Sequence, residues 1–158
     1  ILRPCMIHGP GNKGNLNLLY NVVKRHIPYP LGQFDNKRSF TSIDNLTHII
    51  QNLVTQNIES GIYNIADDQP MSSKQLISII SEELHVKKQI WNTPRFLINF
   101  FARLGDTCHL PFNTFRLKKL TENYIVGNEK IKNRLKITQL PVSAEEGLRK
   151  TIRSFSNK

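Results

Sequence analysis

The residues best suited to chemistry near the start of the chain form a glycine-rich loop with one lysine. Gly9, Gly11 and Gly14 flank Lys13, and apolar residues at helical spacing follow from Asn15. The free backbone N–H groups of a helix N-terminus, together with a lysine, favour a bound anion. An ordinary join between a loop and a helix has the same pattern, so both interpretations stand at this point.

Arg38 lies at the start of a predicted short strand. It follows Lys37 and opens a short apolar segment that ends near Ile43. A guanidinium group presents a planar fork of donors that matches two phosphate oxygens, so an arginine at this position is suited to an anionic ligand. A surface arginine at the start of a strand is the alternative interpretation.

Metal and disulfide chemistry have no support in the sequence. Cys5 and Cys108 are too few for a disulfide framework, and neither has a cysteine or histidine at the spacing of a metal site. We therefore expect no metal, and a reducing, cytoplasmic setting. Asp67 and Asp68 are most simply an acidic loop beside a helix, and His8 is either a polar site residue or a structural histidine.

Charge is distributed unevenly along the chain. The 158 residues carry a formal net charge of +10, and residues 74–158 hold 16 Lys and Arg against 7 Asp and Glu. Such a bias is typical of proteins that bind nucleic acid, an anionic membrane surface or an anionic small ligand, and also of a solvated basic face. No zinc finger, RNP aromatic signature or KH loop accompanies it. No run approaches the roughly 18 apolar residues of a membrane helix.

The alternation of strands and helices predicts an α/β fold in one domain, with 39% hydrophobic residues available for a core. Ile1–Arg3 is a predicted strand followed by a loop to about Lys13, and further short strands are predicted near Arg38 and at Gly61–Ala66. Apolar residues at helical spacing predict helices near residues 15–27, 44–54, 72–84, 94–104, 111–121, 129–135 and 144–155.

Some helix ends carry recognisable caps. Ser72 with Gln75 fits a capping box, as does Ser143 with Glu146, and Asn128 suits the N-cap of the next-to-last helix. The aromatic cluster on the fourth helix is expected to pack in the core or in a dimer interface; its members are Phe96, Phe100 and Phe101.

Several stretches resemble, in order, one family of enzymes. "ILRPCMIHGPG" resembles the sixth strand and following loop of the extended short-chain dehydrogenases/reductases, the nucleotide-sugar epimerases and dehydratases. "RSFTSIDNL" and "GIYNIADDQPMSSKQLISII" resemble the family's later strand–helix units, and "NEKIKNRLKI" with "PVSAEEGLRKTI" resembles its terminal segment. Each stretch alone is weakly specific, but their order and spacing are specific. The likeness is nearest to bacterial enzymes that act on UDP-N-acetylhexosamines.

The resemblance implies that residues 1–158 are the C-terminal, substrate-binding portion of such an enzyme. The implied fold is an α/β arrangement of small strands and helices, with the last strands of a Rossmann-like NAD(P)-binding fold. The Gly-rich cofactor loop and the catalytic Tyr-x-x-x-Lys helix would precede Ile1. Tyr20 and Lys24 match the bare pattern, but they follow the strand that the family's catalytic helix precedes. We therefore expect no catalytic residue here and no turnover by this chain alone.

The resemblance also implies positions for ligands. Pro4 and Cys5 would pass the nicotinamide of NAD or NADP, and Met6 would lie beside the sugar. Arg38 would pair with the substrate diphosphate and is our first candidate for a ligand residue. Met6 and His8 depart from a pattern that often has Asn and Tyr there, which leaves the exact sugar and reaction open. The positions implied beside the nucleotide are Lys13, Gly14, Asn15, Leu16, Leu31 and Gln33, and those implied for a second phosphate contact are Arg103 or Arg116.

The implied partners are a UDP-sugar, the protein's own N-terminal Rossmann half and, for the whole enzyme, a second copy. Nucleic acid and membrane are not expected as partners. The leading hypothesis is a UDP-sugar 4-epimerase, and the first alternative keeps the fold with 4-ketoreductase or dehydratase chemistry. The second alternative is a noncatalytic basic module that binds nucleic acid through residues 116–136.

Overall fold

Short strands join distant parts of the chain. A computed structural model describes residues 1–108 and 112–156. The strands in these ranges are β1 (Leu2–Pro4), β2 (Met6–His8), β3 (Lys37–Arg38), β4 (Phe40–Ser42), β5 (Tyr63–Ile65) and β6 (Met71–Ser72). β1 runs parallel to β5 and β2 parallel to β4, whereas β3 and β6 are antiparallel. Parallel partners need a crossover connection between them, and helical segments provide it.

Helices surround these strand pairs. They are α1 (Asn15–Lys24), α2 (Ile43–Thr55), α3 (Ser73–Glu83), α4 (Arg95–Thr107), α5 (Thr114–Thr121), α6 (Glu129–Leu135) and α7 (Ala144–Ser156). Within the described ranges, no helix has the length and apolar character needed to cross a membrane. The α/β fold class predicted from the sequence is confirmed.

Both predicted capping boxes are present. In α3 the Ser72 hydroxyl accepts from Gln75 N–H, and the Gln75 side chain accepts from Ser72 N–H. In α7 the Ser143 hydroxyl accepts from Glu146 N–H, and the Glu146 carboxylate accepts from Ser143 N–H. These reciprocal bonds satisfy backbone donors that a helix start would otherwise leave unpaired.

Apolar clusters tie the helices to the strands. The first lies among α1, α3 and α7, where Ile80 and Ile152 are fully buried. A second joins α2, β5 and α6 around Ile65, and a third joins α4 and α5 to the segment at Leu31. Fully burying an isoleucine side chain contributes about 1.5–3 kcal/mol, so the first two clusters both stabilise the fold.

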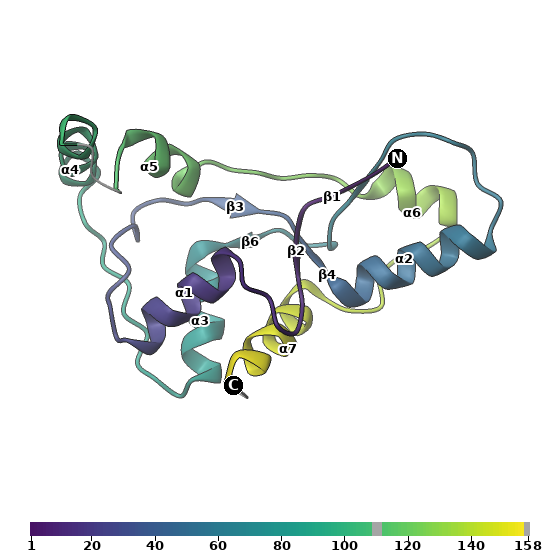
Figure 1. The fold of residues 1–158 in the computed structure, drawn as a ribbon, viewed down its shortest axis with the longest axis horizontal. Coiled ribbons are helices and arrows are strands. Elements are labelled where there is room, and N and C mark those ends of the chain that lie inside the picture. The colour runs from purple at the N-terminus through teal and green to yellow at the C-terminus, as the bar shows by residue number, and fades with distance from the viewer. Residues whose placement is uncertain (109–111, 157–158) are drawn as a thin grey trace.

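Figure 1 shows how these clusters divide the molecule along its length. α4 and α5 lie at one end, α2 and α6 lie at the other, and α1, α3 and α7 lie between them near the C-terminus. β1 and the N-terminus lie beside α6, away from α4 and α5. The pair α4–α5 therefore forms a distinct end of the molecule.

Three local predictions are wrong. The predicted loop before Lys13 contains β2, which pairs with β4 and is too short to show strand periodicity. The Asn128 side chain does not cap α6, because it donates instead to the Ala66 carbonyl (2.8 Å) and to Asp68 (2.9 Å). For the aromatic cluster on α4 the core alternative is wrong, since Phe96 is 74% exposed, and the dimer interface stays a prediction.

Candidate functional site

The backbone at Arg38 is held on both edges. Arg38 pairs with Met71 of β6 on one side and with Tyr124 on the other. Ser39 N–H donates to the Tyr124 carbonyl (2.8 Å), and Tyr124 N–H donates to the Lys37 carbonyl (2.9 Å). These backbone partners on both sides fix the position of the Arg38 Cα atom.

The Arg38 side chain is half-buried and incompletely bonded. Its Nε is buried and has no hydrogen-bond partner among the described residues. Leaving a buried donor unpaired costs about 1–3 kcal/mol, and more for a charged group. Burial raises the pKa of the neighbouring Tyr29, while a hydrogen bond with Ser73 and the positive charge of Arg38 oppose that rise. An anionic acceptor at Arg38 would satisfy the free donor.

Met6 and Leu16, two of the predicted ligand residues, pack in the first apolar cluster. Met6 pairs with Phe40 across β2 and β4, and Met6 packs against the cluster that contains Leu16 and Met71. Leu16 is only 4% exposed, so its side chain offers almost no surface to a ligand. The structure thus brings Met6 and Leu16 to the same cluster as Met71, the ladder partner of Arg38.

The loop before α1 uses part of the predicted anion site for its own turn. The Asn12 side chain accepts from Gly14 N–H (2.7 Å) and donates to the Ile7 carbonyl (3.0 Å). Gly11 adopts a φ of 80°, which glycine tolerates without strain. No side chain caps the start of α1 in the described chain, while Lys13 and Asn15 are exposed beside it. The first amides of α1 therefore remain suited to an anion.

Leu31 and Gln33 lie in the connection between α1 and β3 and contact α4. Leu31 is 3% exposed and packs against Ile98 of α4. The Gln33 side chain is exposed, and its carbonyl accepts from Arg95 Nη2 (3.0 Å). These contacts place both residues with α4 rather than with the cluster at Leu16.

Arg103 and Arg116 are exposed on α4 and α5 respectively. The Gly105–Asp106 pair after Arg103 has a structural role. Gly105 lies against the Phe112 backbone, and Asp106 accepts from Thr114 N–H (3.1 Å) at the start of α5. The Gly105–Asp106 pair therefore joins α4 to α5. Arg103 remains a candidate phosphate contact because of its exposure and charge alone.

Pro4 and Cys5 continue from β1. Pro4 pairs with Ile65, and Cys5 N–H donates to the Ile65 carbonyl (2.9 Å). Pro4 is exposed, whereas Cys5 is 9% exposed. Burial, and then the negative charge of Asp67, raise the pKa of the Cys5 thiol. Cys5 is therefore a neutral thiol at neutral pH, with its backbone donor already in use.

A buried polar network links β2 to α7, and the sequence analysis missed it. Asp67 is 3% exposed and accepts from Ser42 N–H (3.0 Å) and from the Asn45 amide (2.7 Å). His8 Nδ1 lies 3.0 Å from the Thr151 hydroxyl, and His8 Nε2 lies 3.6 Å from an Asp67 oxygen. The residues are far apart in the chain, so no local spacing signals the network.

Tyr20 has a core position. It is 2% exposed, its ring packs against Phe155, and its hydroxyl lies 3.1 Å from Ser156 Oγ. Lys24 Nζ lies 5.8 Å from the Tyr20 ring centroid. The match to a Tyr-x-x-x-Lys pattern is therefore part of the packing between α1 and α7.

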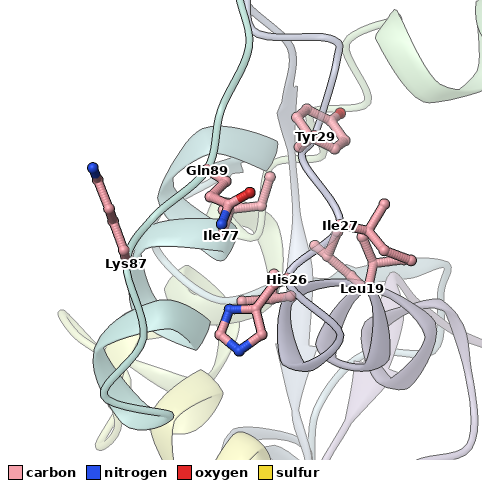
Figure 2. A pocket seen from close by; sticks show the side chains of 9 residues that line it. Leu19, His26, Ile27, Tyr29, Ile77, Lys87 and Gln89 are labelled. Carbon is pink, nitrogen blue, oxygen red and sulfur yellow. The ribbon is translucent and has the colours of Figure 1, made fainter.

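The narrow pocket in Figure 2 is too small for a nucleotide sugar. It lies between α1 and the segment after α3, beside His26 and Lys87, and its volume is about 10 Å³. A cavity of that size holds about one water molecule, whereas ligand sites usually measure about 300–1,000 Å³. The residues lining it include none of the predicted ligand positions.

Comparison with known proteins relates the chain to nucleotide-sugar enzymes. No family model matches. A curated UDP-glucose 4-epimerase from Vibrio cholerae is 29% identical over 96 residues, which cover 60% of this chain and 29% of the relative.

Solved structures extend the likeness over nearly the whole chain. UDP-N-acetylglucosamine 4-epimerase from Bacillus cereus gives a TM-score of 0.68 at 12% identity, covering 99% of this chain and 47% of that one. dTDP-glucose 4,6-dehydratase from Bacillus anthracis in complex with NAD gives 0.67 at 17% identity, covering 99% and 44%. The chain therefore spans less than half the length of these proteins. The sequence similarity to an epimerase covers 96 residues, and this chain shares its fold with part of each of these solved enzymes.

Proposed function

We propose that this chain is the substrate-binding portion of an NAD-dependent UDP-sugar epimerase and that it holds the nucleotide and diphosphate of the substrate. The observation that carries the proposal is Arg38, which is half-buried and whose buried Nε has no hydrogen-bond partner within residues 1–108 and 112–156. A diphosphate supplies acceptors that match this donor, and the charge-assisted bonds it would form are the stronger kind. The curated relative, a UDP-glucose 4-epimerase, supports a UDP-sugar as the ligand.

The start of α1 would contribute the second part of the diphosphate or nucleotide site. Its first amides lack a side-chain cap in the described chain, and Lys13 adds a positive charge next to them. Helix N-termini favour negative charge by about 0.3–1 kcal/mol at an exposed position. Arg38 would therefore supply most of the affinity, and α1 would orient the ligand.

The chemistry would reside outside these residues. NAD, when bound to the whole enzyme, supplies a hydride acceptor for oxidation of a sugar hydroxyl. Exposed Pro4 is suited to border the nicotinamide, while the Cys5 N–H is already bonded to Ile65 and is not free to donate. This chain would bind and orient the substrate, and the chain alone would not turn it over.

A dehydratase or 4-ketoreductase is the second candidate, supported by the likeness to a dTDP-glucose 4,6-dehydratase. All these reactions begin on the same kind of substrate, a nucleoside diphosphate sugar. The residues around Arg38 would bind each of them in the same way. The epimerase is preferred because the relative found by sequence is an epimerase.

Titration calorimetry with UDP tests the proposal on the 158-residue chain. We expect saturable binding that weakens about tenfold or more in Arg38→Gln, since hydrogen bonds to charged groups contribute about 1.5–3 kcal/mol. Arg25→Gln is the matched control, because it removes an exposed arginine at the end of α1. Equal UDP affinity in wild type and Arg38→Gln would refute the role of Arg38. Steep, salt-dependent DNA binding without UDP binding would favour the nucleic-acid alternative.

Turnover is tested separately. The chain is incubated with NAD and UDP-glucose, and the products are followed by NMR. We expect no new sugar and no reduced cofactor. Formation of UDP-galactose by the purified chain would overturn the division of labour proposed above, whatever the UDP titration shows.

A further inference from the structure

The proposed function does not use the exposed apolar face of α4. α4 binds the rest of the protein through a narrow stripe, in which Ile98, Ala102 and Gly105 are buried. The exposed apolar side chains of α4 are Phe96 (74% exposed), Leu97 (36%), Phe100 (60%), Phe101 (51%) and Leu104 (45%). At 100° per residue these five fall on one continuous arc of the helix.

Further exposed apolar side chains lie on neighbouring segments. Trp91, three residues before the Pro94 N-cap of α4, is 61% exposed. On α5, Phe115 is 63% and Leu120 46% exposed. Figure 1 shows α4 and α5 together at one end of the molecule, away from the N-terminus. Exposed large apolar side chains gathered on adjacent segments are typical of interaction sites.

The same two helices are basic. Arg95 and Arg103 on α4 are exposed, as are the α5 residues Arg116, Lys118 and Lys119. Lys119 Nζ lies 4.4 Å from the Phe115 ring centroid, so charge and aromatic surface meet directly. The acidic side chains here are Asp106, which accepts from Thr114 N–H, and Glu122 at the end of α5. A partner of this end of the molecule therefore carries negative charge beside apolar groups.

We propose that the α4–α5 face docks on an anionic lipid bilayer surface, contrary to the expectation from the sequence that a membrane is not a partner. An amphipathic helix with aromatic and leucine side chains on one face and arginine or lysine beside them is typical of helices that lie in the membrane interface. A second copy of the chain fits less well, because a symmetric pairing would bring the same basic side chains together. An acidic protein groove that encloses a helix also fits less well, since Ile98 and Ala102 hold one side of α4 against the protein.

Trp91 provides a built-in probe, because the chain contains one tryptophan. The chain is titrated with vesicles of phosphatidylcholine alone and of phosphatidylcholine mixed equally with phosphatidylglycerol. We expect the Trp91 emission to shift to shorter wavelengths with the anionic vesicles and to be quenched by brominated lipid. Binding measured by co-flotation should fall at high salt, as expected for charges at an anionic surface.

Surface variants separate the apolar from the charged contribution. Phe96→Ser with Phe100→Ser should weaken vesicle binding by about tenfold or more, because it removes apolar surface that enters the interface. Lys118→Gln should weaken it roughly fivefold, since one basic residue near an anionic surface contributes about a factor of that size. Val54→Ser is the control, because Val54 is 82% exposed on α2, at the other end of the molecule.

Three outcomes would overturn the proposal. The first is no binding to anionic vesicles at protein concentrations where the chain is folded. The second is equal binding by wild type and by the Phe96/Phe100 variant. The third is self-association without lipid, seen by analytical ultracentrifugation and lost in the Phe96/Phe100 variant, which would assign the face to a second copy. Circular dichroism of each variant checks that the fold is retained.

Discussion

Asp67 and Asp68 each hydrogen-bond to several segments of the chain, which their sequence positions do not indicate. Asp67 and Asp68 look like an exposed pair beside a helix, yet Asp67 is the acceptor for Ser42 and Asn45. Asp68 accepts from Leu140 N–H (2.9 Å), Lys132 (2.6 Å) and Asn128 (2.9 Å). A carboxylate has two oxygens with several acceptor positions, so each aspartate can join three segments at once.

Asp68 gives the fold a specific sensitivity to acid. Burial by itself would raise the pKa of Asp68, but hydrogen bonds from Leu140, Lys132 and Asn128 hold it below its ordinary value. A depressed folded-state pKa contributes stability above the ordinary carboxyl value, and that stability is lost as the pH falls through the folded pKa. Asp68→Asn should therefore lower the free energy of unfolding by about 1–2 kcal/mol at neutral pH, allowing for partial exposure.

Urea denaturation from neutral pH down to pH about 3 measures this effect, because ordinary carboxyl pKa values lie near 4. The difference between wild type and Asp68→Asn should shrink toward the acid end of the series. Glu122→Gln, which neutralises an exposed carboxylate after α5, is the control. A difference that stays constant with pH would show that the Asp68 charge does not contribute.

At the scale of elements, the helices were predictable and the short strands were less so. α2 and α7 show apolar residues at helical spacing, and the Ser72 and Ser143 capping boxes are present as predicted. β2 has only the residues Met6–His8, and pairing with β4, not a local pattern, makes it a strand. Periodicity needs several residues to be visible, so strands of this length are set by tertiary contacts.

Burial on α4 was the least predictable property of an element. The apolar spacing around Phe100 indicates a helix correctly, but it does not predict which side of the helix packs against the rest of the chain. The small residues Ala102 and Gly105 form the contact, because they let α5 approach closely. Likewise the resemblance singles out Arg38, whereas the burial of its Nε, unpaired among the described residues, is known only from the structure.

Gly105 should show the reverse of the usual effect of glycine in a helix. Replacing a helical glycine with alanine ordinarily stabilises by up to about 1 kcal/mol. A Cβ at Gly105 would lie 1.8 Å from the Phe112 carbonyl oxygen, so α5 would have to move away. We expect Gly105→Ala to destabilise the chain by about 1–3 kcal/mol, measured by urea denaturation, with faster amide exchange in α5.

Gly61→Ala is the control for that substitution, because the nearest atom to its Cβ would be 3.6 Å away. That distance is an ordinary contact, so the change in stability should stay within about 0.5 kcal/mol. Unchanged stability in Gly105→Ala would mean that α4 and α5 do not pack as closely as described.

Across the whole molecule, α7 is the element that connects most of the others. Its Leu148 and Ile152 are fully buried against α3 and α1, and its Thr151 reaches His8 of β2. Arg149 adds charged contacts from α7 to Glu82 and Glu83 of α3, and to Glu145 within α7. Removing Arg149 therefore tests how far electrostatics, beyond the apolar core, hold α7 in place.

Arg149→Met should destabilise the chain by about 1–2 kcal/mol at low salt, because methionine keeps the apolar stem but loses the ion pairs. The exposed partners Glu82 and Glu145 are screened by salt, whereas Glu83, with a side chain 12% exposed, is screened less. The loss measured by urea denaturation should therefore fall at high salt without vanishing. Arg134 of α6 forms an exposed ion pair with Glu59. Arg134→Met removes this pair and should lower the free energy of unfolding by about 0–1 kcal/mol at low salt. If both variants cost the same at low salt, the α3–α7 network contributes no more than an ordinary surface ion pair, and the apolar cluster alone fixes α7.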